Sequence, residues 1–206
     1  MRLRFAHIGA FLILTAFAFL VALNSAIPAQ GRDERSESVA PSASNISVVS
    51  GTIVDPRIEV LKRNRKLILY SGDRVLKTYR VGLGFSPEGP KVRQGDGRTP
   101  EGTYYVCSKN PKSQFFLSLG LSYPNENDAN RGLKDGLISR PQFQQIIAAI
   151  RRGGVPLWNT ALGGEIFIHG AGSRSDWTWG CVALENDDIR ELFDTIPKGT
   201  PVIIKP

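Results

Sequence analysis

The sequence predicts a mainly β domain with two or so short helices, and three observations support this. Hydrophobic residues make up 41% of the 206 residues and charged residues 22%, which is enough apolar material for a packed core. The 21 glycines and 13 prolines are typical of many short elements joined by turns. From Arg57 onward, short runs rich in β-branched and aromatic residues alternate with such turns. The length allows one such domain with extensions.

The expected strands lie in these apolar runs. Asn64 and the turn at 71–73 separate the first three runs, so we expect consecutive hairpins there. The later runs are bounded in the same way by glycine, proline and polar residues. The predicted strands cover residues 58–61, 66–70, 75–83, 103–107, 115–121, 165–168 and 202–204.

Two segments have helical periodicity instead. In the first, Ser139 followed by Gln142 forms a capping box, and Gly153 is expected to end the helix. In the second, Asn186 is the expected N-cap. We expect the polar run 125–128 to be a solvated loop rather than a cation site. The apolar stripes are Phe143, Ile146, Ile147 and Ile150 in the first helix, and Ile189, Leu192, Phe193 and Ile196 in the second.

The N-terminal region is typical of an exported protein. Residues 1–29 combine two arginines with an apolar run over 8–23, which is shorter than the roughly 20 residues that a spanning helix needs. This segment is interpreted as a signal peptide or as an anchor in the inner membrane. Residues 30–56 are polar and predict a flexible tether, which leaves 57–206 as the domain. We expect the domain in the periplasm or cell envelope, with membrane contact only through the N-terminal segment.

The formal net charge is +7, and the basic surplus lies beyond residue 55. Such a domain favours anionic partners, for example an acidic cell-wall polymer. No nucleic-acid motif accompanies the surplus, so nucleic acid is not an expected partner. The dinucleotide fingerprint and the phosphate-binding P-loop are both absent. Two histidines and two cysteines are too few for a ligand-rich metal site, so neither a metal nor a cofactor is expected.

His169 and Cys181 are the strongest candidates for chemistry. His169 ends an apolar run, and Cys181 follows Gly180 just ahead of the second helix. A thiol needs a base to become a nucleophilic thiolate, and histidine is the usual base. Two other interpretations stay open, a buried structural cysteine and a disulfide with Cys107 in an oxidising compartment. Cys107 itself continues a strand, as an ordinary buried residue does.

The surroundings of these two residues resemble the active-site signature of the L,D-transpeptidase catalytic (YkuD-type) domain. That signature pairs His-Gly, here at 169–170, with a Ser/Thr-x-Gly-Cys block, here within 178–184 (TWGCVAL). The segments 82–84 and 95–104 (GDGRTPEGTY) resemble landmarks that precede it, as do Ser122-Tyr123-Pro124-Asn125 and Asp128. The similarity spans Ile58 to Lys205.

The resemblance implies an L,D-transpeptidase-like β-sandwich or sheet fold with a cleft, in an exported enzyme that acts on peptidoglycan stem peptides. Carried over, Cys181 is the nucleophile and His169 its base. The Gly170 carbonyl orients the imidazole, and the Gly180 backbone N–H contributes to an oxyanion hole together with that of Cys181. The candidate substrate-binding residues are Thr178, Trp179, Trp177, Arg174 and Tyr123.

Three functions are consistent with these residues. The first is transpeptidation, in which a Cys181 thioester releases D-alanine and is resolved by an amine of another stem or of a wall-anchored protein. The second is hydrolysis by the same site, as an L,D-carboxypeptidase or amidase. Trp179 and Ala183 motivate it, because many members of the family carry polar residues there. The third is a wall-binding module without catalysis.

Overall fold

The computed structural model describes residues 53–206. The expected leader, 1–29, and nearly all of the expected tether, 30–56, lie outside these residues. Within them, eight strands and three helices form one mainly β unit, as predicted, with one helix more than the two periodic segments indicated. None of the helices in this part of the chain is long and apolar enough to cross a bilayer.

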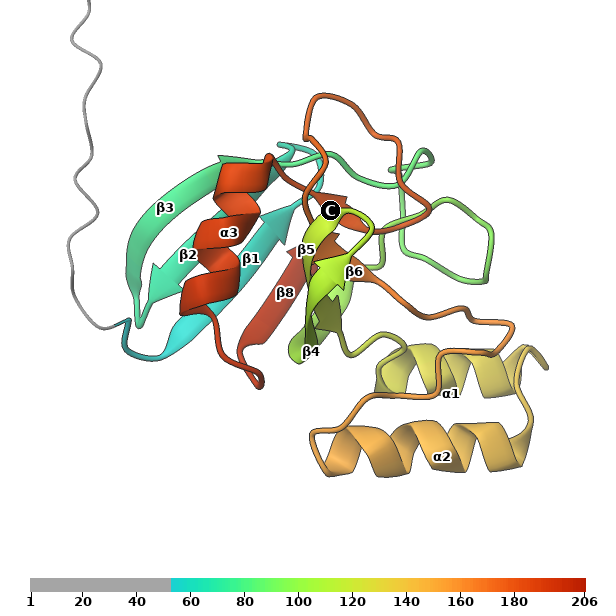
Figure 1. The fold of residues 1–206 in the computed structure, drawn as a ribbon. Helices are drawn as coiled ribbons and strands as arrows, with labels where there is room; N and C mark the ends of the chain where they lie inside the picture. Colours follow the sequence, from blue (N-terminus) through green and yellow to red (C-terminus); the bar gives the residue numbers. More distant parts are fainter. Residues whose placement is uncertain (1–52) are drawn as a thin grey trace, which may run out of the picture. The chain divides into compact units, whose positions relative to one another are not determined.

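The strands form one curled sheet in the order β3-β2-β1-β8-β4-β5-β6-β7 (Figure 1). The two predicted N-terminal hairpins are confirmed, since β1 pairs antiparallel with β2 and β2 with β3. Pairing is parallel between β1 and β8 and between β6 and β7, and antiparallel elsewhere. The strands are β1 (Pro56–Leu61), β2 (Lys66–Ser71), β3 (Arg74–Arg80), β4 (Gly102–Ser113), β5 (Phe116–Leu121), β6 (Phe167–His169), β7 (Val182–Ala183) and β8 (Pro201–Lys205).

The two edges of this sheet meet. Gly82, which follows edge strand β3, exchanges two backbone hydrogen bonds of 2.9 and 2.8 Å with Ala183 of the opposite edge strand β7. Farther along, Gly84 forms a bridge with Thr178. Because paired edges expose no free ladder groups, this contact fixes the segment before β7 against the loop after β3. The short strand β7 was not predicted, since two residues carry no periodicity.

Helix α3 (Asn186–Thr195) covers the apolar face of the sheet (Figure 1). Its Ile189 and Leu192 belong to the same buried cluster as Ile58 and Leu67 of the sheet. The prediction that Asn186 caps this helix is wrong, because Glu185 is the N-cap and makes no side-chain capping bond. The Asn186 Oδ1 atom instead accepts the Ala171 N–H at 2.9 Å, so a long-range contact replaces the local one.

Helices α1 (Glu126–Lys134) and α2 (Arg140–Arg151) lie side by side and enclose a second apolar cluster around Ile146 and Leu162 (Figure 1). The capping box at the start of α2 is confirmed, and the helix ends just before Gly153. The expectation of a solvated loop at 125–128 is wrong. Asn125 caps α1 in a capping box with Asp128, whose buried carboxylate suits the N-terminus of the helix.

Candidate active site

Parallel pairing of β6 with β7 brings His169 and Cys181 to one face of the sheet. Ile168 and Val182 are partners in this ladder, and both are fully buried in the main core. Because side chains alternate along a strand, the neighbouring His169 and Cys181 project to the opposite face. Cys181 lies level with Phe167, so the spacings of a sheet place the Cα atoms of His169 and Cys181 about 8 Å apart. The two predicted residues therefore lie on neighbouring strands and on the same face of the sheet.

The His169 imidazole is held on three sides. Its Nδ1 atom lies 2.7 Å from the Gly170 carbonyl oxygen. The ring stacks on Phe115, with centroids 4.6 Å apart, and meets Trp177 edge-on at 5.6 Å. Only 2% of the residue is exposed, and this burial lowers the pKa of His169 below its ordinary value of 6.5. The imidazole is therefore neutral at pH 7, which is the form a base requires.

The Cys181 thiol makes two hydrogen bonds with backbone groups. The Phe167 N–H donates to Sγ at 3.4 Å, and the thiol donates to the Glu165 carbonyl oxygen at 3.6 Å. Burial raises the pKa of Cys181 to about 11, and the bond from Phe167 opposes this only in part. The shifted pKa values thus favour a protonated thiol and a neutral imidazole.

Two threonines hold the backbone of Cys181. The Thr178 hydroxyl donates to the Cys181 carbonyl oxygen at 2.8 Å, and the Thr99 hydroxyl approaches the same oxygen at 3.4 Å. The Gly180 N–H donates to Thr178 Oγ1 at 3.1 Å, so this predicted oxyanion donor already has a partner. Gly180 has φ +129, and a Cβ there would lie 2.6 Å from the Arg98 carbonyl oxygen. The turn before Cys181 therefore requires glycine.

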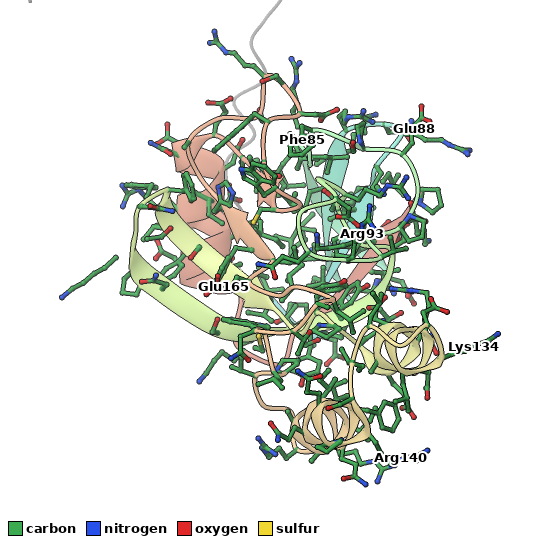
Figure 2. All side chains as sticks on the ribbon, turned by 90° about the vertical axis from the view of Figure 1, so that its right-hand side faces the viewer. Phe85, Glu88, Arg93, Lys134, Arg140 and Glu165 are labelled. Atoms are coloured by element: carbon green, nitrogen blue, oxygen red, sulfur yellow. The ribbon has the colours of Figure 1, made fainter. Side chains whose placement is uncertain are left out.

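A pocket of about 380 Å³ opens beside Cys181. Trp179 stands at this pocket with 70% of its surface exposed, and its ring meets Phe85 edge-on with centroids 4.9 Å apart. Figure 2 shows Phe85 and Arg93 on the loop above, Glu165 on the segment before β6, and α1 and α2 end-on below. The lining residues are Lys91, Gln94, Gly95, Trp158, Gly163, Gly164, Glu165, Ile166, Trp179 and Cys181.

The remaining predicted substrate-binding residues lie in different environments. Trp177 is 37% exposed, contacts His169 and donates its indole N–H to the Gly172 carbonyl at 3.1 Å. Arg174 lies exposed on the loop between His169 and Cys181. Tyr123 is fully buried and donates its hydroxyl to the Leu162 carbonyl at 2.9 Å. It therefore stabilises the packing of Leu162 in the apolar cluster beneath α1 and α2.

The disulfide alternative is wrong for this structure, in which Cys107 and Cys181 are both free. The Cys107 thiol is buried in β4 and donates to the Gly120 carbonyl of β5 at 3.3 Å. Within residues 53–206, no group of three or more His, Cys, Asp or Glu side chains is placed to hold a metal ion.

Sequence reasoning missed three residues of the site. Lys91 lines the pocket as a buried cation paired with Asp96, Phe115 stacks on the catalytic candidate His169, and Asn186 anchors the chain just after Gly170. Of the residues in these contacts, Asp96, the partner of Lys91, lies in the GDGRTPEG run that the sequence had already marked. The other contacts join segments far apart in the chain, so no local pattern announces them.

The signature blocks and the geometry agree with the comparison to known families. Residues 55–204 match the YkuD family, which is the L,D-transpeptidase catalytic domain. The chain belongs to this family. The match covers the whole described unit apart from a few terminal residues, and it includes the strands, helices and pocket set out above. Two residues of the stretch 95–104 contact the site. Asp96 accepts a hydrogen bond from Lys91, and the Thr99 hydroxyl approaches the Cys181 carbonyl oxygen.

Relatives of this L,D-transpeptidase-family domain occur among curated proteins. The chain is 33% identical over 145 residues to the protein named "Putative L,D-transpeptidase YafK" of Escherichia coli (strain K12), and the figures are the same for the protein of that name from strain O157:H7. The match covers 68% of this chain and 46% of each relative. The chain therefore spans about half the length of these relatives.

Solved structures give weaker matches. Bd1075 of Bdellovibrio bacteriovorus is 24% identical, with a TM-score of 0.49 over 74% of this chain and 48% of that one. The helical cell shape determining protein Pgp2 of Campylobacter jejuni is 22% identical, with a TM-score of 0.47 over 77% and 52%. An L,D-transpeptidase from Mycobacterium smegmatis is 12% identical, with a TM-score of 0.44 over 74% and 59%.

Proposed function

We propose that this domain is a peptidoglycan L,D-transpeptidase that forms a Cys181 thioester with a stem peptide and transfers it to an amine in the cell wall. The observation that supports this is the pairing of β6 with β7, from which His169 and Cys181 project to one face of the sheet, with Cys181 beside an open pocket. Membership in the family makes stem peptides the expected substrate class.

The reaction begins with proton transfer. The Nε2 atom of His169 takes the thiol proton, and the Cys181 thiolate attacks the carbonyl carbon of the third stem residue. The bond from that carbonyl to the D-alanine nitrogen then breaks, and the imidazolium returns its proton to the departing amine. In the second half, an acceptor amine attacks the thioester, His169 accepts the amine proton, and the carbon–sulfur bond breaks.

In this proposal the thiol is unreactive until substrate binds. Sγ donates to the Glu165 carbonyl, and burial holds the pKa of Cys181 near 11. We propose that the thiol turns from Glu165 toward His169 once substrate fills the pocket. A thiolate with a high pKa is also intrinsically more nucleophilic, so the cost of forming it is partly recovered in the attack.

The oxyanion is assigned to the backbone N–H of Cys181. The Gly180 N–H, which was expected to contribute, donates to Thr178 in the resting structure. In this proposal Gly180 and Thr178 shape the turn that presents the Cys181 amide, and Gly180 joins only by exchanging its bond with Thr178. Backbone donors held in this way need no reorganisation as charge develops on the substrate oxygen.

Hydrolysis is the second candidate, and the exposed Trp179 favours it. An indole that is 70% exposed at the pocket offers an apolar contact, where a polar side chain could bind an acceptor amine. Ala183 is fully buried in the seam with Gly82 and offers no polar group either. Water would then resolve the thioester, which makes the domain an L,D-carboxypeptidase or an amidase that acts on wall-linked protein.

The proposed setting is the cell envelope. The net charge of +7 favours association with an anionic wall, and the N-terminal segment is assigned to export. Wall association of this kind weakens as salt is added, because exposed charges are screened over about 10 Å at 0.1 M ionic strength.

The test is the intact mass of the purified full-length chain after exposure to disaccharide-tetrapeptide, with Cys181→Ala in parallel. We expect an adduct on the parent chain alone, together with free D-alanine. Crosslinked product indicates transpeptidation, and shortened monomeric product indicates hydrolysis. A parent chain that forms no adduct and releases no D-alanine, from either tetrapeptide or intact sacculi, would leave the wall-binding module as the function.

A further inference from the structure

Lys91 is a buried cation in the wall of the Cys181 pocket. Its side chain is 3% exposed, and Nζ donates to Asp96 Oδ1 at 2.8 Å and to the Arg93 carbonyl at 3.1 Å. The pocket glycine Gly163 packs over it, since a Cβ on that glycine would lie 3.4 Å from the Lys91 Cε atom. An ammonium group has three N–H donors, so two fixed bonds leave one donor unassigned by these contacts.

The partner of this cation cannot easily move. The Asp96 carboxylate accepts the backbone N–H groups of Val92, Arg93 and Arg98 at 2.8, 3.1 and 3.1 Å. The Lys91 backbone is held as well, because its carbonyl accepts a bond of 3.0 Å from Arg131 of α1. These bonds therefore hold the ammonium at one position in the pocket wall.

The charges around Cys181 are few. The segment 178–183 carries no ionisable side chain apart from Cys181 itself, and His169 on β6 is neutral at pH 7. Glu165, before β6, raises the pKa of Cys181, and Lys91 lowers it. Asp96 lies beyond Lys91 on the same loop. Since Glu165 reaches solvent and Lys91 does not, water screens the acidic charge more than the basic one.

We propose that Lys91 is a positioning residue, the fixed counter-charge that stabilises the Cys181 thiolate as His169 removes its proton. A cation lowers the free energy of a nearby thiolate without affecting the neutral thiol, so it shifts the thiol equilibrium toward the reactive form. This role deepens the function proposed above and rests on it. The ionisation of Cys181 can nevertheless be measured without any turnover.

The test follows the rate of Cys181 alkylation by iodoacetamide from pH 7 to pH 10 in the full-length chain, read on the Cys181 peptide by mass spectrometry. In the main variant, Lys91→Met is combined with Asp96→Asn, so that no unpaired carboxylate is left buried. Lys91→Gln, which keeps a hydrogen-bond donor, is the second variant, and Lys91→Arg is the rescue. The control combines Lys62→Met with Glu101→Gln.

Lys62 is a matched control because it is another buried lysine that holds the same loop. Its Nζ donates to the Gly89 and Thr99 carbonyls and to Glu101, at 2.6, 2.9 and 2.8 Å. It does not line the Cys181 pocket. A loosened loop would expose the thiol and speed its alkylation, whereas loss of the Lys91 charge slows it. The two effects therefore have opposite signs.

We expect the Lys91→Met/Asp96→Asn and Lys91→Gln variants to be alkylated about tenfold more slowly at pH 7.5, which is a rise of about one pKa unit. Lys91→Arg should stay within about threefold of the parent, and the Lys62 control should be unchanged or faster. Equal rates in parent and neutral variants would overturn the proposal, as would an equal slowing in the control. If these rates behave as expected but no stem peptide is turned over, the proposed function fails and the Lys91 role stands.

Discussion

The Nδ1 atom of His169 lies 2.7 Å from the carbonyl oxygen of Gly170, the next residue in the chain. A carbonyl oxygen only accepts hydrogen bonds, so Nδ1 carries the proton and Nε2 keeps its lone pair. This one contact selects the tautomer that can act as a base toward Cys181. Burial between Phe115 and Trp177 lowers the pKa of the ring, which keeps it neutral.

The activity should persist in mild acid. A base works only when unprotonated, and burial lowers the pKa of His169 below 6.5 in the folded domain. The midpoint of the acid limb of kcat/KM for D-alanine release should therefore lie below pH 6.5. The measurement is a pH–rate profile on tetrapeptide. A limb centred above pH 7 would contradict the tautomer and burial argument.

Gly170→Ala should damage the site without unfolding the domain. A Cβ there would lie 2.5 Å from Asn186 Oδ1 and 3.0 Å from the Phe115 carbonyl, so these two groups must shift. We expect an acylation rate about 10²-fold lower, the scale that follows an ångström of misplacement. Gly154→Ala is the matched control, because its Cβ meets only the flexible Arg152 side chain closely. Equal losses in both variants would refute the explanation.

Thr178→Val should destabilise the turn that presents Cys181. The change removes the bond to the Cys181 carbonyl and leaves the buried Gly180 N–H without its acceptor. We expect the free energy of unfolding to fall by about 1–3 kcal/mol, measured by urea denaturation, and acylation to slow. Thr178→Ser keeps the hydroxyl and should restore both. If the serine variant behaves like the valine variant, the methyl group and not the hydroxyl is what matters.

Lys62→Met should strongly destabilise the domain, because the Lys62 side chain holds the loop that carries Lys91. It leaves the partly buried Glu101 carboxylate and two carbonyls without their donor. We expect a loss of about 3 kcal/mol in the free energy of unfolding, with a good part recovered when Glu101→Gln is added. Additive losses in the double variant would show that the two side chains do not act as a pair.

The two cysteines should behave independently. Both are free, and Cys107 is buried against Gly120 while Cys181 lines the pocket. We expect two titratable thiols in denaturant without reductant, and alkylation of Cys181 ahead of Cys107 in the native protein. Cys107→Ala should leave the Cys181 alkylation rate unchanged. If no thiol is titratable in denaturant without reductant, the disulfide interpretation is restored.

Local patterns in the sequence were sufficient for much of the fold. The hairpins of β1 to β3 follow from apolar runs broken at Asn64 and at residues 71–73, and α2 follows from its capping box. The same kind of pattern existed at Asn125, where Asp128 completes a capping box, but the apolar stripe behind it is short and the helix was missed. Asn186 shows the opposite case. Its residue type and position predicted an N-cap, but its side chain accepts a hydrogen bond from the distant Ala171 N–H.

By itself, then, the sequence determined the mainly β class, the family and the candidate pair of His169 and Cys181, because these depend on short motifs, each of which is contiguous in the chain. Only the tertiary structure decided which groups surround that pair. Phe115 on His169, Thr99 at the Cys181 carbonyl and Lys91 in the pocket wall are all contacts between distant segments. They join segments that are distant in the chain, and the free energy of such contacts depends on the packing of the whole domain.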